Sequence, residues 1–248
     1  MPEGSALSRG CVRDRTHALK RAGRPPSAMI RRPEVPLPAP VRAVLFDMDG
    51  VLVFSEDAWF SVFNETLTGF GHRPVSRAEF DAIYGNGAAA DRDAYMPERR
   101  VEEIDAAYAR LFEAHLGEIR PNAEAVPVLA ELRRRGIRTS VATNTTAPLA
   151  RRVLALHGLL PLLDATASAD EAGAGKPDPA VVRLAAARVG EPLEACLFVG
   201  DSRYDEAAGA AAPVRFVGLA HGTGTRIEQL GELLALVPAA AAPLNSPV

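Results

Sequence analysis

Val44-Leu45-Phe46-Asp47-Met48-Asp49-Gly50 is the stretch that decides how this 248-residue chain folds. An apolar run this short predicts a buried strand, and residues two apart in a strand point the same way. The glycine permits a sharp turn that leaves both carboxylates facing one small space. Two like charges held that close are costly unless a cation or a chemical task requires them. A divalent metal combined with covalent chemistry supplies both reasons.

Two structural alternatives compete for the same residues. The pattern Asp-x-Asp-Gly also forms turns at strand ends, and it can open a calcium-binding loop. The calcium pattern needs further oxygen ligands at regular spacing and a glutamate twelve residues along. The residues that follow here are instead Val51, Leu52, Val53 and Phe54. The stretch alone favours a site and a turn equally, so the later strand ends must decide.

Composition and charge narrow the classes of function. The chain is 48% hydrophobic and 24% charged, an ordinary globular balance, and its length suits one large domain or a domain with a smaller insert. Its net charge is −3, but residues 1–40 carry +5, which leaves −8 for the rest. Acidic bodies bind polyanions poorly, so we expect no nucleic-acid partner. No apolar stretch is long enough to span a membrane, so we expect no membrane partner.

Both ends of the chain are expected to lie outside the folded body. Residues 1–40 are rich in proline and arginine, which is typical of a disordered extension, and residues 238–248 are predicted to be a flexible tail. The prolines break the amphipathic helix that a transit peptide needs, and no apolar segment of a secretion signal is present. A translation start nearer Met29 would explain the composition of the first segment equally well. The two cysteines form no disulfide framework or zinc spacing, so we expect a cytoplasmic protein.

From residue 41 onward, short apolar runs alternate with amphipathic stretches. The runs lie at 41–46, 138–143, 163–167, 195–199 and 214–217. This alternation predicts an α/β fold, with a Rossmann-like parallel sheet and helices on both faces. We assign residues 41–54 and 122–237 to that core.

About ninety residues separate the first two predicted strands of the core, far more than a usual connection. Most of them are expected to be helical, over 56–68, 76–83 and 98–117. Ligands of parallel sheets bind beyond the carboxyl ends of the strands, so a helical insert there would cover the site and exclude water. We therefore predict an inserted all-helical cap over 55–121. The alternative is a pair of helices that only pack together.

Three later strand ends carry polar residues. Thr143-Asn144 could cap a helix or, with free backbone N–H groups, hold a phosphate. In the loop 175–179, Gly-Lys-Pro-Asp-Pro, two prolines fix the backbone around Lys176, whose side chain lies either in solvent or aimed at negative charge. Asp201 and Asp205 lie four apart at a helix start, where acids share a face and are also common for dipole reasons. Together with Asp47 and Asp49, these two residues supply carboxylate oxygens, the kind of ligand that Mg²⁺ prefers.

In this order the four motifs resemble those of the haloacid dehalogenase superfamily of phosphotransferases, over roughly residues 41–222. The resemblance implies that Asp47 is a nucleophile that forms an aspartyl-phosphate. It implies that Asp49 is the general acid and base. Thr143 and the backbone of Asn144 would hold the phosphoryl oxygens, and Lys176 would neutralise Asp47 and the phosphate.

The resemblance also implies a cofactor and a reaction. Mg²⁺ would be held by Asp47, Asp201 and the carbonyl of Asp49, with Asp205 beside them. Dehalogenases of this family lack the second aspartate, so Asp49 indicates phosphoester chemistry. Gly200-Asp201 looks like the phosphatase branch, since phosphomutases with this kind of cap tend to have Glu-Asp. We expect a Mg²⁺-dependent phosphatase of a small phosphorylated metabolite, monomeric or homodimeric; a sugar phosphomutase and a non-catalytic binding module are the alternatives.

The cap should choose the substrate. Residues 84–93 predict a glycine-bearing break between helices, which is either a simple turn or a contact to the substrate. In the second interpretation, Asn86 or Arg92 reaches the leaving group. Phe54 replaces an acid that relatives often carry at the start of the cap, a departure that bears on substrate polarity or on the hinge. Phosphoglycolate, sugar phosphates and phosphorylated precursors of specialised metabolism all fit the resemblance.

Overall fold

The computed structural model of the chain describes residues 40–238. The predicted extension over 1–40 and tail over 238–248 therefore lie, apart from one residue of each, outside the described residues. No helix between residues 40 and 238 is both long enough and apolar enough to cross a membrane.

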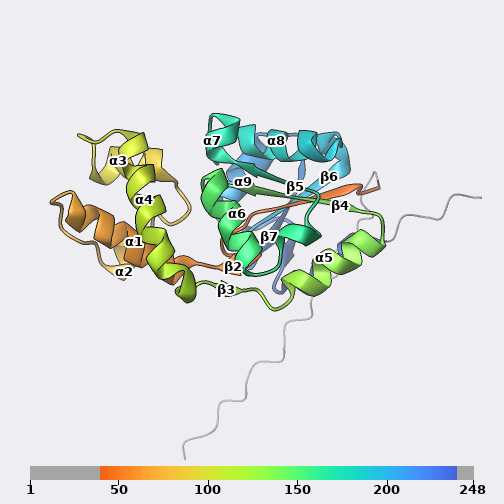
Figure 1. The fold of residues 1–248 in the computed structure, drawn as a ribbon. Coiled ribbons are helices and arrows are strands. Elements are labelled where there is room, and N and C mark those ends of the chain that lie inside the picture. The colour runs from red at the N-terminus through yellow and green to blue at the C-terminus, as the bar shows by residue number, and fades with distance from the viewer. Residues whose placement is uncertain (1–39, 239–248) are drawn as a thin grey trace, which may run out of the picture. The chain divides into compact units, whose positions relative to one another are not determined.

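A six-stranded parallel sheet forms the core (Figure 1). Its strands lie in the order β5 (Ala165–Ser168), β4 (Arg138–Thr143), β1 (Ala43–Phe46), β6 (Cys196–Gly200), β7 (Arg215–Leu219) and β8 (Arg226–Ile227). Five of them match the predicted apolar runs, and β8 is an addition. In the central strand, Phe46 lies in register with Val141 of β4 and Val199 of β6. The residue after β1 therefore lies beside the ends of both neighbouring strands.

Helices cover both faces of this sheet, as the alternation of apolar runs predicts. The helices α5 (Ala125–Arg134) and α6 (Ala147–Leu156) pack with Val44 and Phe46 of β1. The helices α8 (Ala180–Val189) and α9 (Arg203–Ala210) pack on the other face with Ala43 and Leu45. Because successive side chains of a strand point to opposite faces, a strand buried on both sides must be continuously apolar. Complete burial of a side chain such as Leu45 contributes about 1.5–3 kcal/mol. Two short helices, α7 (Ala169–Ala172) and α10 (Leu233–Leu236), complete this part.

Four helices follow β1 along the chain before α5 and lie together beside the sheet in Figure 1. They are α1 (Glu56–Gly69), α2 (Arg77–Asp81), α3 (Ala88–Tyr95) and α4 (Val101–His115). The chain enters and leaves them through a two-stranded antiparallel ribbon, β2 (Val53–Phe54) with β3 (Arg120–Pro121). Aromatic side chains fill the space between these helices, among them Trp59, Phe63, Phe80, Tyr108 and Phe112. The inserted helical cap is therefore confirmed, while the exact domain bounds stay a prediction.

The expected helix break over 84–93 is shorter than predicted. Gly85 and Gly87 have φ angles of +91° and +85°, a conformation that favours glycine, and they form the break. Residues 88–95 instead form α3, because the three alanines after Gly87 are strong helix formers. Residues 88–95 thus belong to a cap helix that packs against α4.

Candidate active site

Asp47 lies at the carboxyl end of the central strand. Its backbone N–H donates to the carbonyl of Val199 in β6 (2.8 Å), which continues the sheet by one residue. Its side chain is buried, and Oδ1 lies 2.7 Å from Nζ of Lys176. Burial, Asp205 and Asp201 raise the pKa of Asp47 well above its ordinary value, although Lys176 opposes them. The carboxylate predicted as the nucleophile thus lies against a buried ammonium.

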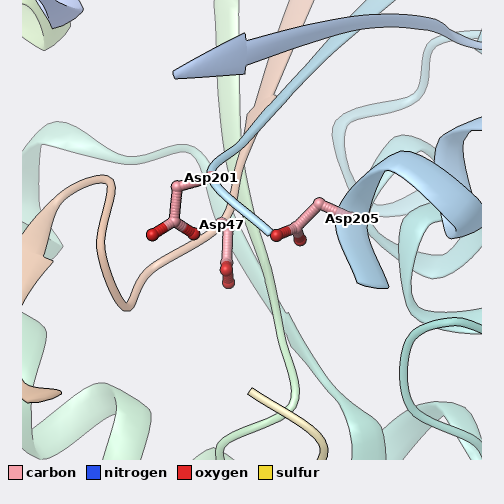
Figure 2. Close-up of side chains that lie close together, drawn as sticks. All are labelled: Asp47, Asp201 and Asp205. Atoms are coloured by element: carbon pink, nitrogen blue, oxygen red, sulfur yellow. The ribbon is translucent and has the colours of Figure 1, made fainter. Parts of the chain in front are cut away.

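Asp47, Asp201 and Asp205 come together as a cluster (Figure 2). One oxygen from each lies within 4.8 Å of the other two. Asp205 is held from both sides, because Oδ1 accepts from Nζ of Lys176 (2.7 Å) and Oδ2 from the backbone N–H of Ser202 (3.1 Å). Carboxylate oxygens at this spacing are the hard ligands that a divalent metal takes.

The site carries more negative than positive charge. Asp49 adds a fourth carboxylate to the three of the cluster. Lys176 is the one cation among the described residues that line the cavity. Burial alone would lower the pKa of Lys176, but Asp205 and Asp47 raise it above its ordinary value, so the side chain stays charged. Burial and Asp205 raise the pKa of Asp201 to about 7. A bound divalent cation would offset this repulsion between carboxylates, so the donor set fits such an ion.

Two glycines make the carboxylate cluster sterically possible. Gly50 has a φ of +82°, and a Cβ there would lie 1.8 Å from Oδ2 of Asp201. A Cβ on Gly200 would lie 2.3 Å from Cβ of Asp205. Any side chain at either position would displace a carboxylate, so both glycines are needed for close approach.

Asp49 makes a separate set of contacts. Its Oδ1 accepts hydrogen bonds from the hydroxyl of Ser55 and from Nε1 of Trp59 (3.3 Å). Its Oδ2 accepts from Oγ1 of Thr145 (2.9 Å). The side chain is not a member of the three-carboxylate cluster. The two carboxylates of the opening stretch are therefore held by different partners, which gives them different chemistry.

Thr143 ends β4, and Asn144 follows it. Thr143 is buried and lines the cavity. The side chain of Asn144 joins two loops: Nδ2 donates to the carbonyls of Gly85 (2.9 Å) and Lys176 (3.0 Å), and Oδ1 accepts from the N–H of Lys176 (2.7 Å). Asn144 thus ties the lysine loop to the cap, a role that the sequence did not indicate.

A cavity of about 100 Å³ lies where the cap meets these strand ends. Its core side holds the predicted site residues Asp47, Asp49, Thr143, Asn144, Lys176 and Asp201, and Asn86 lines it from the cap. Asp205 does not line the cavity but contacts Nζ of Lys176 (2.7 Å). The structure does not bring Arg92 to the cavity, because its guanidinium is bound to Asp93 next to it (2.8 Å). Phe54, in the ribbon that joins cap and core, is exposed.

Several residues at the site were missed by sequence reasoning. Ser55 and Trp59 lie four apart across the start of α1, so the helical period could have placed both beside Asp49. Thr145 lies two residues after Thr143, so its place next to a predicted strand end could have indicated that it lies near the site. Tyr84 and Asp91 also line the cavity, but their positions depend on how the cap helices pack, which no local pattern reveals.

Residues 41–213 match the family described as haloacid dehalogenase-like hydrolase. The chain belongs to this family. A phosphoglycolate phosphatase of Cereibacter sphaeroides (strain ATCC 17029 / ATH 2.4.9) is 36% identical over 183 residues, which cover 70% of this chain and 82% of the relative. Since such phosphatases are its relatives and its fold is that of the hydrolase family, the chain is an enzyme, a phosphatase of the haloacid dehalogenase type.

Solved structures agree with this family. CbbY from Rhodobacter sphaeroides, in complex with phosphate, is 25% identical and superimposes with a TM-score of 0.70, covering 79% of this chain and 99% of CbbY. A Lactobacillus plantarum protein, 23% identical, shows the same fold with a TM-score of 0.72 over 80% of this chain and 100% of its own. The predicted family and α/β fold are confirmed.

Proposed function

We propose that this phosphatase hydrolyses a small phosphate monoester with the help of Mg²⁺, through an aspartyl-phosphate on Asp47. The observation that carries the proposal is the contact of Asp47 with Lys176 at 2.7 Å. A phosphate ester and a carboxylate repel each other, so attack requires positive charge beside the nucleophile. Lys176 is buried and fixed between two carboxylates, so it supplies that charge without having to move.

In the first step, an oxygen of Asp47 attacks phosphorus and the bond from phosphorus to the leaving oxygen breaks. Asp49 gives its proton to that leaving oxygen. The hydrogen bonds from Ser55, Trp59 and Thr145 to the Asp49 carboxyl support this role, because they fix the group that must reach the leaving oxygen. The alcohol then departs toward the cap.

In the second step, Asp49, now ionised, takes a proton from a water molecule. The water oxygen attacks phosphorus, the bond to Asp47 breaks, and phosphate is released with both carboxyl groups restored. Thr143 and the backbone N–H of Asn144 hold the phosphoryl oxygens in both steps. The position of Thr143 at the end of the strand next to β1 supports this assignment.

Asp47, Asp201 and the carbonyl of Asp49 would hold Mg²⁺, with Asp205 beside them. When bound, the ion supplies positive charge against the phosphoryl oxygens and the clustered carboxylates. The excess of carboxylates over ammonium groups at the site supports this cofactor.

The relatives support a small phosphorylated substrate. They include phosphoglycolate phosphatases, and CbbY has been solved with phosphate and, as a mutant, with xylulose-(1,5)bisphosphate. A phosphomutase is disfavoured. The resemblance associates mutases with a glutamate at position 200, where this chain has glycine and where a Cβ would lie 2.3 Å from Cβ of Asp205. A cytoplasmic location and a monomeric or homodimeric state stay predictions.

A phosphate-release screen over many phosphorylated metabolites, with Mg²⁺ and with EDTA, tests the proposal. We expect free phosphate and the parent alcohol, formed only when Mg²⁺ is present. An isomeric phosphate in place of free phosphate would identify a mutase. Turnover that persists in EDTA would exclude the cofactor assignment.

A further inference from the structure

The cap side of the cavity is aromatic and acidic. Its lining includes the rings of Trp59, Phe63, Phe80, Tyr84 and Tyr108, together with the carboxylates of Asp91 and Asp105. Among the described lining residues, the one cation is Lys176, and it is already held between Asp47 and Asp205. The part of the cavity that must receive the leaving group therefore offers negative charge and π faces.

The arginines closest in sequence to the lining residues are bound elsewhere. Arg92 contacts Asp93 (2.8 Å), and Arg203 donates to the carbonyl of Ala82 (2.8 Å). Arg151 contacts Glu171 (3.2 Å). None of these three guanidinium groups lines the cavity. A leaving group with its own carboxylate or second phosphate would meet no cation of the described cap.

The two cap carboxylates have spare capacity for a positive partner. Oδ2 of Asp91 accepts a hydrogen bond from the hydroxyl of Tyr108 (2.8 Å), and no cation of the described residues lies within ion-pair distance of it. Asp105, on α4, makes neither a side-chain hydrogen bond nor an ion pair with any described residue. Burial raises the pKa of Asp91 to about 7, with Tyr108 opposing. Burial and Asp170 raise the pKa of Asp105. Neither carboxylate is thus paired with a cation of the described residues, as a charge withdrawn from water normally is.

We propose that the substrate is the phosphate ester of a small amino alcohol, whose ammonium group is held by Asp91 and Asp105 against the rings of Trp59 and Tyr108. This inference rests on the proposed phosphatase function and names its substrate class. Aromatic faces attract cations, most strongly in desolvated sites. In this arrangement the oxygen that carries the phosphate faces Asp47 and Asp49, and the amine faces the cap.

The size of the cavity limits the alcohol. About 100 Å³ is the volume that roughly three water molecules take up in the liquid. A cavity of this size favours a small alcohol. The carboxylate of phosphoglycolate would instead place a third negative charge beside Asp91 and Asp105, which is unfavourable.

Three esters of similar length test the inference: 2-aminoethyl phosphate, propyl phosphate and phosphoglycolate, which carry a cationic, a neutral and an anionic end. With Mg²⁺ at pH 8, we expect kcat/KM to be at least tenfold higher for 2-aminoethyl phosphate than for propyl phosphate, and lowest for phosphoglycolate. The variants Asp91→Asn and Asp105→Asn should each lower the ratio of the first two values severalfold. Asp93→Asn, which removes the exposed neighbouring carboxylate, should leave that ratio unchanged.

Turnover of p-nitrophenyl phosphate separates this inference from the proposed function. If the wild-type enzyme hydrolyses that ester with Mg²⁺ but prefers phosphoglycolate to 2-aminoethyl phosphate, the inference alone is overturned. The same conclusion follows if neither Asp91→Asn nor Asp105→Asn changes the ratio. If no ester is hydrolysed, both the proposed function and the inference are overturned.

Discussion

Oδ2 of Asp201 lies 1.8 Å from the point where a Cβ on Gly50 would stand. A carboxylate from the end of β6 therefore occupies the space that a side chain after β1 would need. The glycine of the opening stretch provides a turn with φ of +82°, but it also admits the second carboxylate of the cluster. This contact connects two motifs that are about 150 residues apart in the sequence.

Gly50→Ala should displace Asp201 and strain the turn, because alanine disfavours positive φ. We expect kcat/KM for p-nitrophenyl phosphate with Mg²⁺ to fall at least a hundredfold, as estimated for loss of a preorganised charged group. Gly69→Ala at the end of α1 is the matched control, since a Cβ there meets nothing within 4 Å. Wild-type activity in Gly50→Ala would refute the steric role of this glycine.

Mg²⁺ should raise the melting temperature of the wild-type protein, because the ion relieves repulsion between the carboxylates. At a hundredfold excess over the dissociation constant, binding stabilises the folded state by about 2.7 kcal/mol, or several degrees for a chain of this size. In Asp201→Asn the increase should be much smaller, whereas the exposed Asp57→Asn should keep it. Differential scanning fluorimetry measures these melting temperatures. If Mg²⁺ raises them equally in all three proteins, this cluster is not the metal site.

Asn144→Ala should loosen the cap while sparing the backbone N–H at that position. It removes side-chain bonds to Gly85 and Lys176, each contributing about 0.5–1.5 kcal/mol. We expect faster hydrogen exchange over residues 82–87 and at least a tenfold lower kcat/KM. Asn64→Ala is the control, since that side chain bonds only to Val75 within the cap. Exchange that is the same in both variants would mean that Asn144 does not hold the cap.

Asp91→Asn should stabilise the protein in a pH-dependent way. Burial raises the pKa of Asp91 to about 7, above about 3.9 in an unfolded chain, so its ionisation opposes folding at pH values above the unfolded pKa. This opposition is full above pH 7 and fades as the pH falls toward 4. Asparagine still accepts a bond from Tyr108, so the free energy of unfolding should rise by about 1–3 kcal/mol at pH 8 and by less at pH 5. Urea unfolding that shows the same difference at both pH values would contradict the raised pKa.

The four motifs of the site could be predicted because each signal is local. An apolar run ending in Asp47, Thr143 or Asp201 marks a strand and its end, and parallel connections bring such ends to one edge of a sheet. The cap could be inferred from the length of the insertion and from its helical patterns. The helix α3 was not predicted, because two glycines masked the helix-forming alanines after Gly87.

The lining of the cap could not be predicted, since it depends on tertiary packing. Trp59 and Tyr108 lie on different helices and meet edge to face at 5.5 Å, and Asp91 reaches the cavity from a third. Arg92, which with Asn86 was a candidate contact to the leaving group, is one position further along α3 and does not line the cavity. A single helical step of about 100° separates Arg92 from Asp91, which does line it.

The most direct test of the account is phosphate release from p-nitrophenyl phosphate in Mg²⁺ by the wild type, Asp47→Asn and Asp57→Asn. Asp57 is an exposed carboxylate on α1, so it controls for the loss of one negative charge. We predict that Asp47→Asn lowers kcat by about a thousandfold or more while the protein stays folded, and that Asp57→Asn behaves as the wild type. Turnover by folded Asp47→Asn within tenfold of the wild type would contradict the assignment of Asp47 as the nucleophile.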